Sequence, residues 1–212
     1  MGNSQSPIPE VVIFRLPIYL YMLSLLNEEN TEVVSSQELG SRLQMTPAQI
    51  RKDLSYFGKF GKQGKGYHVK KLYAELRKIM GLDQEWNMAL IGVGRIGKAL
   101  LHGNLALRGF KIVAAFDIDP EIIGAQEGEL IIQDVRELAQ TTKGRDVRIG
   151  VVAVPPPEVQ KTVDALVQCG IKAILNYSLV AAKVPPDVRV RRVDPMFALQ
   201  TITYYLRSLN TL

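Results

Sequence analysis

Residues 89–100 read ALIGVGRIGKAL, and this stretch decides the fold of the C-terminal half of the 212-residue chain. A short apolar run leads into Gly92, Gly94 and Gly97, which form the pattern G-x-G-x-x-G ahead of an expected helix over residues 98–107. In a strand–loop–helix unit the first glycine makes a tight turn, the second leaves room for a pyrophosphate, and the third lets the helix pack on the strand. The pattern therefore predicts a dinucleotide-binding unit.

The segment KIVAAFDIDP, residues 111–120, completes this unit with a second strand that ends at Asp117. Asp117 follows Gly92 by 25 residues, which is near the spacing at which a carboxylate binds the ribose hydroxyls of a dinucleotide. A carboxylate at this position repels a 2′-phosphate, so the sequence favours NAD(H) over NADP(H). Asp119 either shares this role or is a turn residue before Pro120.

The chain then continues to alternate strands and helices, which predicts an α/β fold with a Rossmann-type doubly wound parallel sheet. Residues 147–154, 172–178 and 188–193 are expected strands, and residues 155–170 are an expected helix. Ligands bind at the carboxyl ends of such strands, so residues there either line a pocket or are plain loop residues. Arg95 either flanks the pyrophosphate or is an ordinary surface arginine. The candidate cofactor-binding residues are Gly92, Val93, Gly94, Arg95, Ile96, Gly97, Asp117, Asp119, Val154, Pro155, Asn176, Tyr177 and Ser178.

Residues 14–80, upstream of this unit, are expected to form four helices and a hairpin. Apolar residues at helical spacing predict the first helix over residues 14–29 and the fourth over residues 68–80. Capping signals begin the second helix at Ser35 and the third at Thr46. The residues that these helices are expected to bury are Leu16, Leu20, Leu23, Leu26, Leu39, Leu43, Ile50, Leu54, Phe57, Val69, Leu72, Leu76 and Ile79.

Between the third and fourth helices, residues 58–67 read GKFGKQGKGY, and this alternation of glycine and lysine predicts a tight basic hairpin. Three short helices followed by a basic hairpin form the winged-helix plan, in which the third helix enters the major groove of DNA and the wing touches an adjoining groove or the backbone. The candidate DNA-binding residues are Gln49, Arg51, Lys52, Ser55, Tyr56, Lys59, Lys62, Lys65, Gly66 and Tyr67.

The distribution of charge supports a polyanionic partner for this N-terminal part. Residues 42–78 hold ten basic and two acidic residues, a net charge of +8, whereas the whole chain carries +5. A basic module joined to a mildly acidic one is typical of nucleic-acid binding, because phosphate contacts require clustered lysine and arginine. The alternative interpretation of the third helix is a solvated basic face with only a structural role.

The composition narrows the possible functions further. A single cysteine, Cys169, excludes an internal disulfide framework and fits a reducing cytoplasm. No run of about 18 apolar residues is present, so we expect no membrane-spanning segment. Two histidines and no evident acid–base pair or metal-ligand set leave no catalytic or metal site, so a bound dinucleotide would act as a signal. Two alternatives stay open: a small NAD-dependent dehydrogenase with an accessory helical domain, and a CoA-binding protein.

The sequence is expected to divide into three parts. Residues 1–80 are the expected winged-helix domain, residues 81–193 the Rossmann domain, and residues 194–212 a C-terminal helix capped by Asp194. This last helix is apolar on most sides, so we expect it to pack into a second subunit.

The chain resembles the Rex family of bacterial redox-sensing transcriptional repressors. The resemblance is carried by SSQELGSRLQMTPAQIRKDLSYFGKFGKQGKGY, GVGRIGKAL, FDIDP, AVPPPEVQ and VDPMFALQTITYYL. It implies a homodimer with exchanged C-terminal helices that binds palindromic double-stranded operator DNA, is released by NADH and is permitted or favoured on DNA by NAD⁺. It also implies that Arg15 and Asp194 form a switch pair that is linked in the DNA-competent state.

The chain departs from the family pattern at three places. Gly103 stands where members often carry a tyrosine near the nicotinamide, which implies a weaker preference between NADH and NAD⁺. Ser178 and Leu179 stand where alanine and proline are usual, and Ala198 stands where glutamate is frequent.

Overall fold

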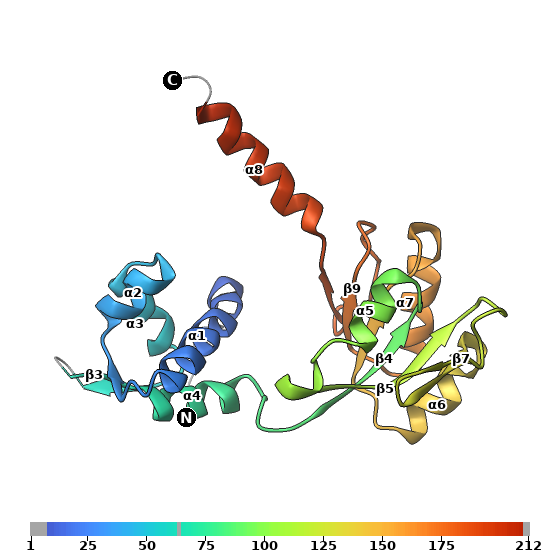
Figure 1. Ribbon diagram of the computed structural model, residues 1–212, viewed down its shortest axis with the longest axis horizontal. Coiled ribbons are helices and arrows are strands. Elements are labelled where there is room, and N and C mark those ends of the chain that lie inside the picture. The colour runs from blue at the N-terminus through green and yellow to red at the C-terminus, as the bar shows by residue number, and fades with distance from the viewer. Residues whose placement is uncertain (1–7, 63–64, 210–212) are drawn as a thin grey trace. The chain divides into compact units, whose positions relative to one another are not determined.

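The computed structural model describes residues 8–62 and 65–209, and it divides into two compact units, Met1–Gln84 and Glu85–Leu212 (Figure 1). The division falls inside the 81–87 segment, where a glycine and polar residues interrupt the apolar pattern. The domain limits at residues 80 and 193 remain predictions.

The described residues of the first unit form four helices and a small sheet. The helices are α1 (Glu10–Glu28), α2 (Ser36–Leu43), α3 (Pro47–Ser55) and α4 (Val69–Ile79), and the strands are β1 (Val33–Val34), β2 (Gly61–Lys62) and β3 (Gly66–His68). Ser35 Oγ accepts a hydrogen bond from the Glu38 N–H at 3.0 Å, and Thr46 Oγ1 accepts one from the Gln49 N–H at 3.2 Å. Both predicted helix starts are therefore formed by N-terminal capping.

The wing is an antiparallel sheet in which β3 lies between β1 and β2. Gly66, at φ +71°, is required by this sheet, because an added Cβ would lie 2.5 Å from the carbonyl oxygen of Val34. The glycine thus allows β1 to approach β3 and is accounted for without a ligand. Gln63 and Gly64 lie outside the described residues, as does the side chain of Lys62.

The core of the first unit is built mainly from one face of each helix. Its buried hydrophobic residues are Leu16, Tyr19, Leu20, Leu23, Leu26, Val34, Leu39, Ile50, Leu54, Tyr67, Val69, Leu72 and Leu76. Two expectations for this core need correction. Ile79, expected inside, is 37% exposed because it is the last residue of α4. Helix α1 begins at Glu10, and not at residue 14.

Helix α1 has 19 residues and contains an 18-residue window with a mean hydropathy of 1.4, so by length and composition alone it could cross a membrane. Its apolar content has another explanation, since its buried residues pack in the core of the first unit. A second apolar group on α1 is exposed and comprises Val11, Ile13, Phe14, Ile18 and Tyr21.

The second unit is a seven-stranded sheet in the order β10-β9-β8-β4-β5-β7-β6, with every neighbouring pair parallel except β6–β7. The strands are β4 (Trp86–Ile91), β5 (Phe110–Asp117), β6 (Gln126–Glu127), β7 (Leu130–Asp134), β8 (Ile149–Val152), β9 (Ala173–Asn176) and β10 (Arg189–Arg192). Because β5 and β8 lie on opposite sides of β4, the winding direction reverses at β4. This is the doubly wound topology expected from the glycine pattern.

The helical segments of this unit are α5 (Arg95–Leu101), η1 (Ala106–Arg108), η2 (Val135–Glu137), α6 (Leu138–Gly144), η3 (Pro156–Glu158), α7 (Val159–Gln168) and α8 (Pro195–Leu209). The helix expected over residues 98–107 is wrong in its extent, because α5 ends at Leu101 and a separate 3₁₀ turn follows. The β6–β7 hairpin and α6 are not among the elements expected from the sequence, because neither has a long apolar period.

Every side chain of α8 from Pro195 to Arg207 is exposed, although much of the helix is apolar. The exposed large hydrophobic residues are Met196, Phe197, Leu199, Ile202, Tyr204, Tyr205 and Leu206. A helix with this composition is stable in water only when another surface covers it.

Candidate dinucleotide site and nucleic-acid interface

The glycine loop between β4 and α5 joins two adjacent strands to the helix by close backbone contacts. Gly92 has φ +94°, and an added Cβ there would lie 2.5 Å from the carbonyl oxygen of Ala153 at the end of β8. A Cβ at Gly97 would collide with the carbonyl oxygen of Gly92. A Cβ at Gly94, in contrast, meets no atom within 4 Å and the backbone there is unstrained. Gly92 and Gly97 therefore serve the fold, whereas Gly94 leaves open space at the loop.

Asp117, at the carboxyl end of β5, holds this loop in place. One carboxylate oxygen accepts a hydrogen bond from the Val93 N–H at 2.7 Å, and the other accepts from the N–H groups of Ile118 and Asp119 at 2.7 and 3.1 Å. Asp119 itself accepts from the Glu121 N–H at 3.0 Å, as a turn residue does. Of the two acids, Asp117 is thus the one tied to the glycine loop.

Of the other predicted cofactor residues, some are exposed at the surface and others pack in the core. Arg95 and Ile96 are exposed at the start of α5, and Pro155 is exposed after β8. Val93 is buried with its side chain in the core, so only its backbone can face a ligand. Val154 packs partly against the core.

For the side chains of Asn176 and Ser178, the structure favours the second of the two alternatives, that of loop residues. The Asn176 amide donates to the Val180 carbonyl at 3.0 Å and accepts from the Ser178 N–H at 2.9 Å, and Asn176 is fully buried. Ser178 is also buried, and its hydroxyl accepts from the Val180 N–H at 3.4 Å. These side chains shape the loop after β9, since their polar atoms are used locally. Tyr177, between them, packs partly against the core.

A further acid lies at the same edge of the sheet. Asp134, at the end of β7, pairs in register with Asp117 on β5. The Arg136 guanidinium donates to both oxygens of Asp134, and this contact lowers the pKa of Asp134 to about 2. The ion pair between Asp134 and Arg136 was not predicted from the sequence, because an acidic and a basic residue separated by one position carry no distinctive signal.

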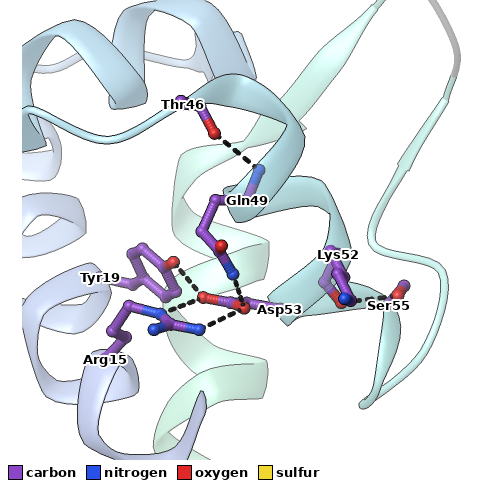
Figure 2. Close-up of polar contacts among 7 residues, drawn as sticks. All are labelled: Arg15, Tyr19, Thr46, Gln49, Lys52, Asp53 and Ser55. Carbon is purple, nitrogen blue, oxygen red and sulfur yellow. Dashed lines mark hydrogen bonds and ion pairs between the residues drawn. The ribbon is translucent and has the colours of Figure 1, made fainter. Parts of the chain in front are cut away.

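In the first unit, Asp53 of α3 is the centre of a buried polar network (Figure 2). Arg15 of α1 donates to both carboxylate oxygens through Nε and Nη2, at 2.5 and 2.8 Å. The hydroxyl of Tyr19 donates to Asp53 at 2.6 Å, and the amide of Gln49 donates at 2.7 Å. Arg15 and Tyr19 lie one turn apart on α1, so both reach the same carboxylate of α3. The network therefore ties α3 to α1.

The hydrogen bonds to Asp53 favour its ionised form. Burial by itself would raise the pKa of Asp53, but the hydrogen bonds from Arg15, Tyr19 and Gln49 outweigh burial and hold that pKa below its usual value. Burial, with the hydrogen bond to Asp53, raises the pKa of Tyr19 far above its usual value, so the phenol stays protonated. A fully buried carboxylate with four donated hydrogen bonds is a stable anchor for α3.

The predicted DNA-binding residues of α3 are not equivalent in the structure. Arg51, Lys52 and Ser55 are exposed on the outer face, and Tyr56 is half-buried at the end of the helix. Gln49 was expected to point outward, but its amide is directed at Asp53, because residue 49 lies one turn before residue 53. Within the described part of the chain, Lys52 makes no side-chain hydrogen bond or ion pair, which leaves its amine available.

The wing residues also separate into two groups. Lys59 and Lys65 are exposed, whereas Tyr67 is only 8% exposed and belongs to the core. On β3 alternate residues face the core, and Tyr67 is on that side, but it also lines the groove between α3 and the wing. Its contact with DNA stays a prediction.

Of the predicted switch pair, Arg15 is engaged by Asp53, and Asp194 accepts a hydrogen bond from the Met196 N–H at 2.7 Å at the start of α8. Their mutual pairing remains a prediction. In the sequence, Asp53 stands out only as an acid that opposes the basic residues around it. Its position between Ile50 and Leu54, both buried, was the signal that could have marked it as an internal acid.

Comparison with known protein families and structures agrees with this two-unit organisation. Residues 7–55 match a family described as a putative DNA-binding protein N-terminus, and residues 83–180 match a CoA binding domain family. Redox-sensing transcriptional repressor Rex of Chloroflexus aggregans is 46% identical over 97% of this chain and 97% of its own length. The Rex protein of a Roseiflexus species is 43% identical over 100% of this chain and 96% of its own.

Solved structures of a Rex-family repressor named RSP share the fold. The complex of RSP with β-NAD⁺ and operator DNA has a TM-score of 0.92 at 36% identity, covering 97% of this chain and 95% of that one. The complex of RSP with β-NADH has a TM-score of 0.89 at 33% identity, covering 97% of both chains.

A winged-helix unit joined to a dinucleotide-binding unit defines a DNA-binding protein that responds to a nucleotide. Within that class, this chain belongs to the Rex family of redox-sensing transcriptional repressors. The family comprises transcriptional repressors, not enzymes, which confirms the expectation that the Rossmann fold here carries no catalytic role.

Proposed function

We propose that this protein represses transcription by binding operator DNA as a homodimer and leaves the DNA when NADH occupies the second unit. The observation that carries the proposal is the joining, in one chain, of an exposed basic α3 and wing to a glycine loop tied to Asp117. The exposed lysines that would contact DNA are Lys52, Lys59 and Lys65. Lys62 is proposed to contact DNA as well, because it lies on strand β2 of the wing. The site of action is the cytoplasm, where a bacterial operator lies.

The proposed homodimer forms by exchange of α8. Its exposed apolar side chains would insert into the partner subunit, where they lose their contact with water. In a two-fold dimer the two α3 helices must lie about 34 Å apart, or a multiple of that distance, to enter successive major grooves. A palindromic operator follows from this symmetry.

The redox response follows from the charge of the nicotinamide. Oxidised nicotinamide carries a positive charge that NADH lacks, and burying a charge in a dry pocket is costly. NADH therefore favours a closed dimer, and closure as a rigid body changes the spacing of the two α3 helices. The coupling is reciprocal, so operator DNA weakens NADH binding by the same factor by which NADH weakens DNA binding.

The proposal is tested with a duplex that the protein selects from a random library. We expect NADH to weaken binding of the selected duplex by about 5- to 150-fold, since coupling free energies between two sites are commonly about 1–3 kcal/mol. Fluorescence anisotropy titrations without cofactor, with NADH and with NAD⁺ measure the effect. Affinity that is the same in all three titrations would contradict redox sensing. Ligand-induced rises in Tm with NADH but not with CoA would distinguish the proposal from a CoA-binding function.

A further inference from the structure

The groove between α3 and the wing in the first unit has a volume of about 700 Å³. Arg51 and Lys59 line it together with Ser35, Ser36 and Ser55. Lys52, the next residue to Arg51 on α3, does not line the groove. Two adjacent basic side chains of the same helix therefore face different surroundings.

The direction of the Arg51 side chain is set by α2. Its Nη1 donates a hydrogen bond to Ser36 Oγ at 2.9 Å, and Ser36 is the first residue of α2. Arg51 thus lies across the start of α2, with the remaining N–H groups of its guanidinium free to bind a second acceptor. Because Ser36 Oγ accepts this bond, its own O–H can donate elsewhere.

The start of α2 adds further hydrogen-bond donors to the surroundings of Arg51 and adds little negative charge. Ser35 Oγ satisfies the Glu38 N–H, while helix geometry leaves the N–H groups of Ser36 and Gln37 without an intrahelical acceptor. Glu38, the only acid in α2, lies 3.7 Å from Arg42. Asp53, the only acid in α3, is buried against Arg15. The positive charge of Arg51 in the groove is therefore not neutralised by an acid of either helix.

We propose that Arg51 and Ser36 form a phosphate clamp that holds the sugar–phosphate backbone of DNA, and that Lys52 alone of this basic pair reads base edges. The inference rests on the proposed DNA binding and assigns different tasks to two residues that the sequence left equivalent. A planar guanidinium matches a phosphate with two parallel hydrogen bonds, and the Ser36 contact fixes its plane beforehand. Phosphate contacts position a protein on DNA, whereas base contacts give specificity.

The test compares the full-length variants Arg51→Ala and Lys52→Ala on two duplexes: one selected by the wild-type protein from a random library and a scrambled version of it. We expect Arg51→Ala to weaken binding of both duplexes by the same factor, about tenfold or more at about 0.1 M salt. The slope of log K against log salt concentration should become shallower by about 1.8, because each half of the dimer would neutralise one phosphate fewer. Lys52→Ala should instead reduce mainly the preference for the selected duplex.

The matched control is Arg42→Ala, which removes an arginine of α2 that is paired with Glu29 and Glu38 and does not line the groove. It should leave both affinities and the salt slope close to wild type. Circular dichroism and Tm establish that the variants fold, as expected for exposed residues. Loss of preference for the selected duplex in Arg51→Ala, with an unchanged salt slope, would overturn the clamp. A wild-type protein that selects no duplex would instead overturn the proposed DNA binding itself, and the clamp with it.

Discussion

Replacement of Asp53 by alanine is expected to lower the free energy of unfolding of the first unit by about 3 kcal/mol, because removing one partner of a buried ion pair leaves the others unsatisfied. The Tyr19 hydroxyl, on a residue that is 1% exposed, would lose its acceptor, and Arg15 would lose both bonds of its guanidinium fork. Urea unfolding of the full-length protein, followed by circular dichroism, measures the change. Because α3 loses its anchor, DNA binding should weaken as well.

The matched control removes an exposed aspartate. Asp187→Ala breaks an ion pair between Asp187 and Lys172 at 2.8 Å, the same distance as that between Arg15 Nη2 and Asp53. The side chains of Asp187 and Lys172 are, however, mostly exposed. The cost of this substitution should be about 0.5 kcal/mol or less. Equal costs for the two variants would show that the Asp53 network does not stabilise the fold.

The stabilisation from Asp53 should depend on pH with a definite sign. Its pKa is lowered in the folded state, so the unfolded chain takes up a proton first as the pH falls. The contribution is fully present above the unfolded value of about 3.9 and declines as the pH falls through the folded value. The difference in unfolding free energy between wild type and Asp53→Ala should therefore be constant near neutral pH and shrink below about pH 4.

Replacement of Gly94 by alanine is expected to abolish most NADH binding while leaving the ligand-free protein intact. The new Cβ meets no protein atom within 4 Å, and the backbone there has an ordinary φ of −73°, so the fold should accept it. In the proposed complex the same space belongs to the pyrophosphate. Overpacking of about 1–3 kcal/mol corresponds to a roughly 5- to 150-fold loss of NADH affinity. Calorimetric titration with NADH measures it, and NADH should no longer release DNA from this variant.

Gly144→Ala is the control for Gly94→Ala, since it adds the same methyl group to α6 where no atom lies within 4 Å. It should not change NADH affinity. Gly92→Ala and Gly97→Ala are unsuitable, because their Cβ atoms would collide with the backbone and disturb the fold itself. Unchanged NADH affinity in Gly94→Ala would place the pyrophosphate elsewhere.

Much of the candidate site could be located from sequence, because short-range patterns report local structure. The capping residues Ser35 and Thr46 placed two helix starts correctly, and the glycine pattern placed the loop and its acid, Asp117. In each case the residues that make the structure are neighbours in the chain or follow a fixed spacing. Such signals are independent of how distant elements pack.

Other properties depended on contacts between segments far apart in the chain, which no local pattern contains. Asp53 is an internal anchor because α1 brings Arg15 and Tyr19 to its carboxylate. The Tyr67 ring packs in the core because β3 pairs with β1, and the exposed Arg51 side chain is directed toward α2 by its hydrogen bond to Ser36. Residue type and spacing thus established the two units and their ligand classes, whereas packing decided which side chains of each unit remain free to bind. A side chain is available to a ligand only when no internal partner satisfies it, and internal partners are set by the tertiary fold.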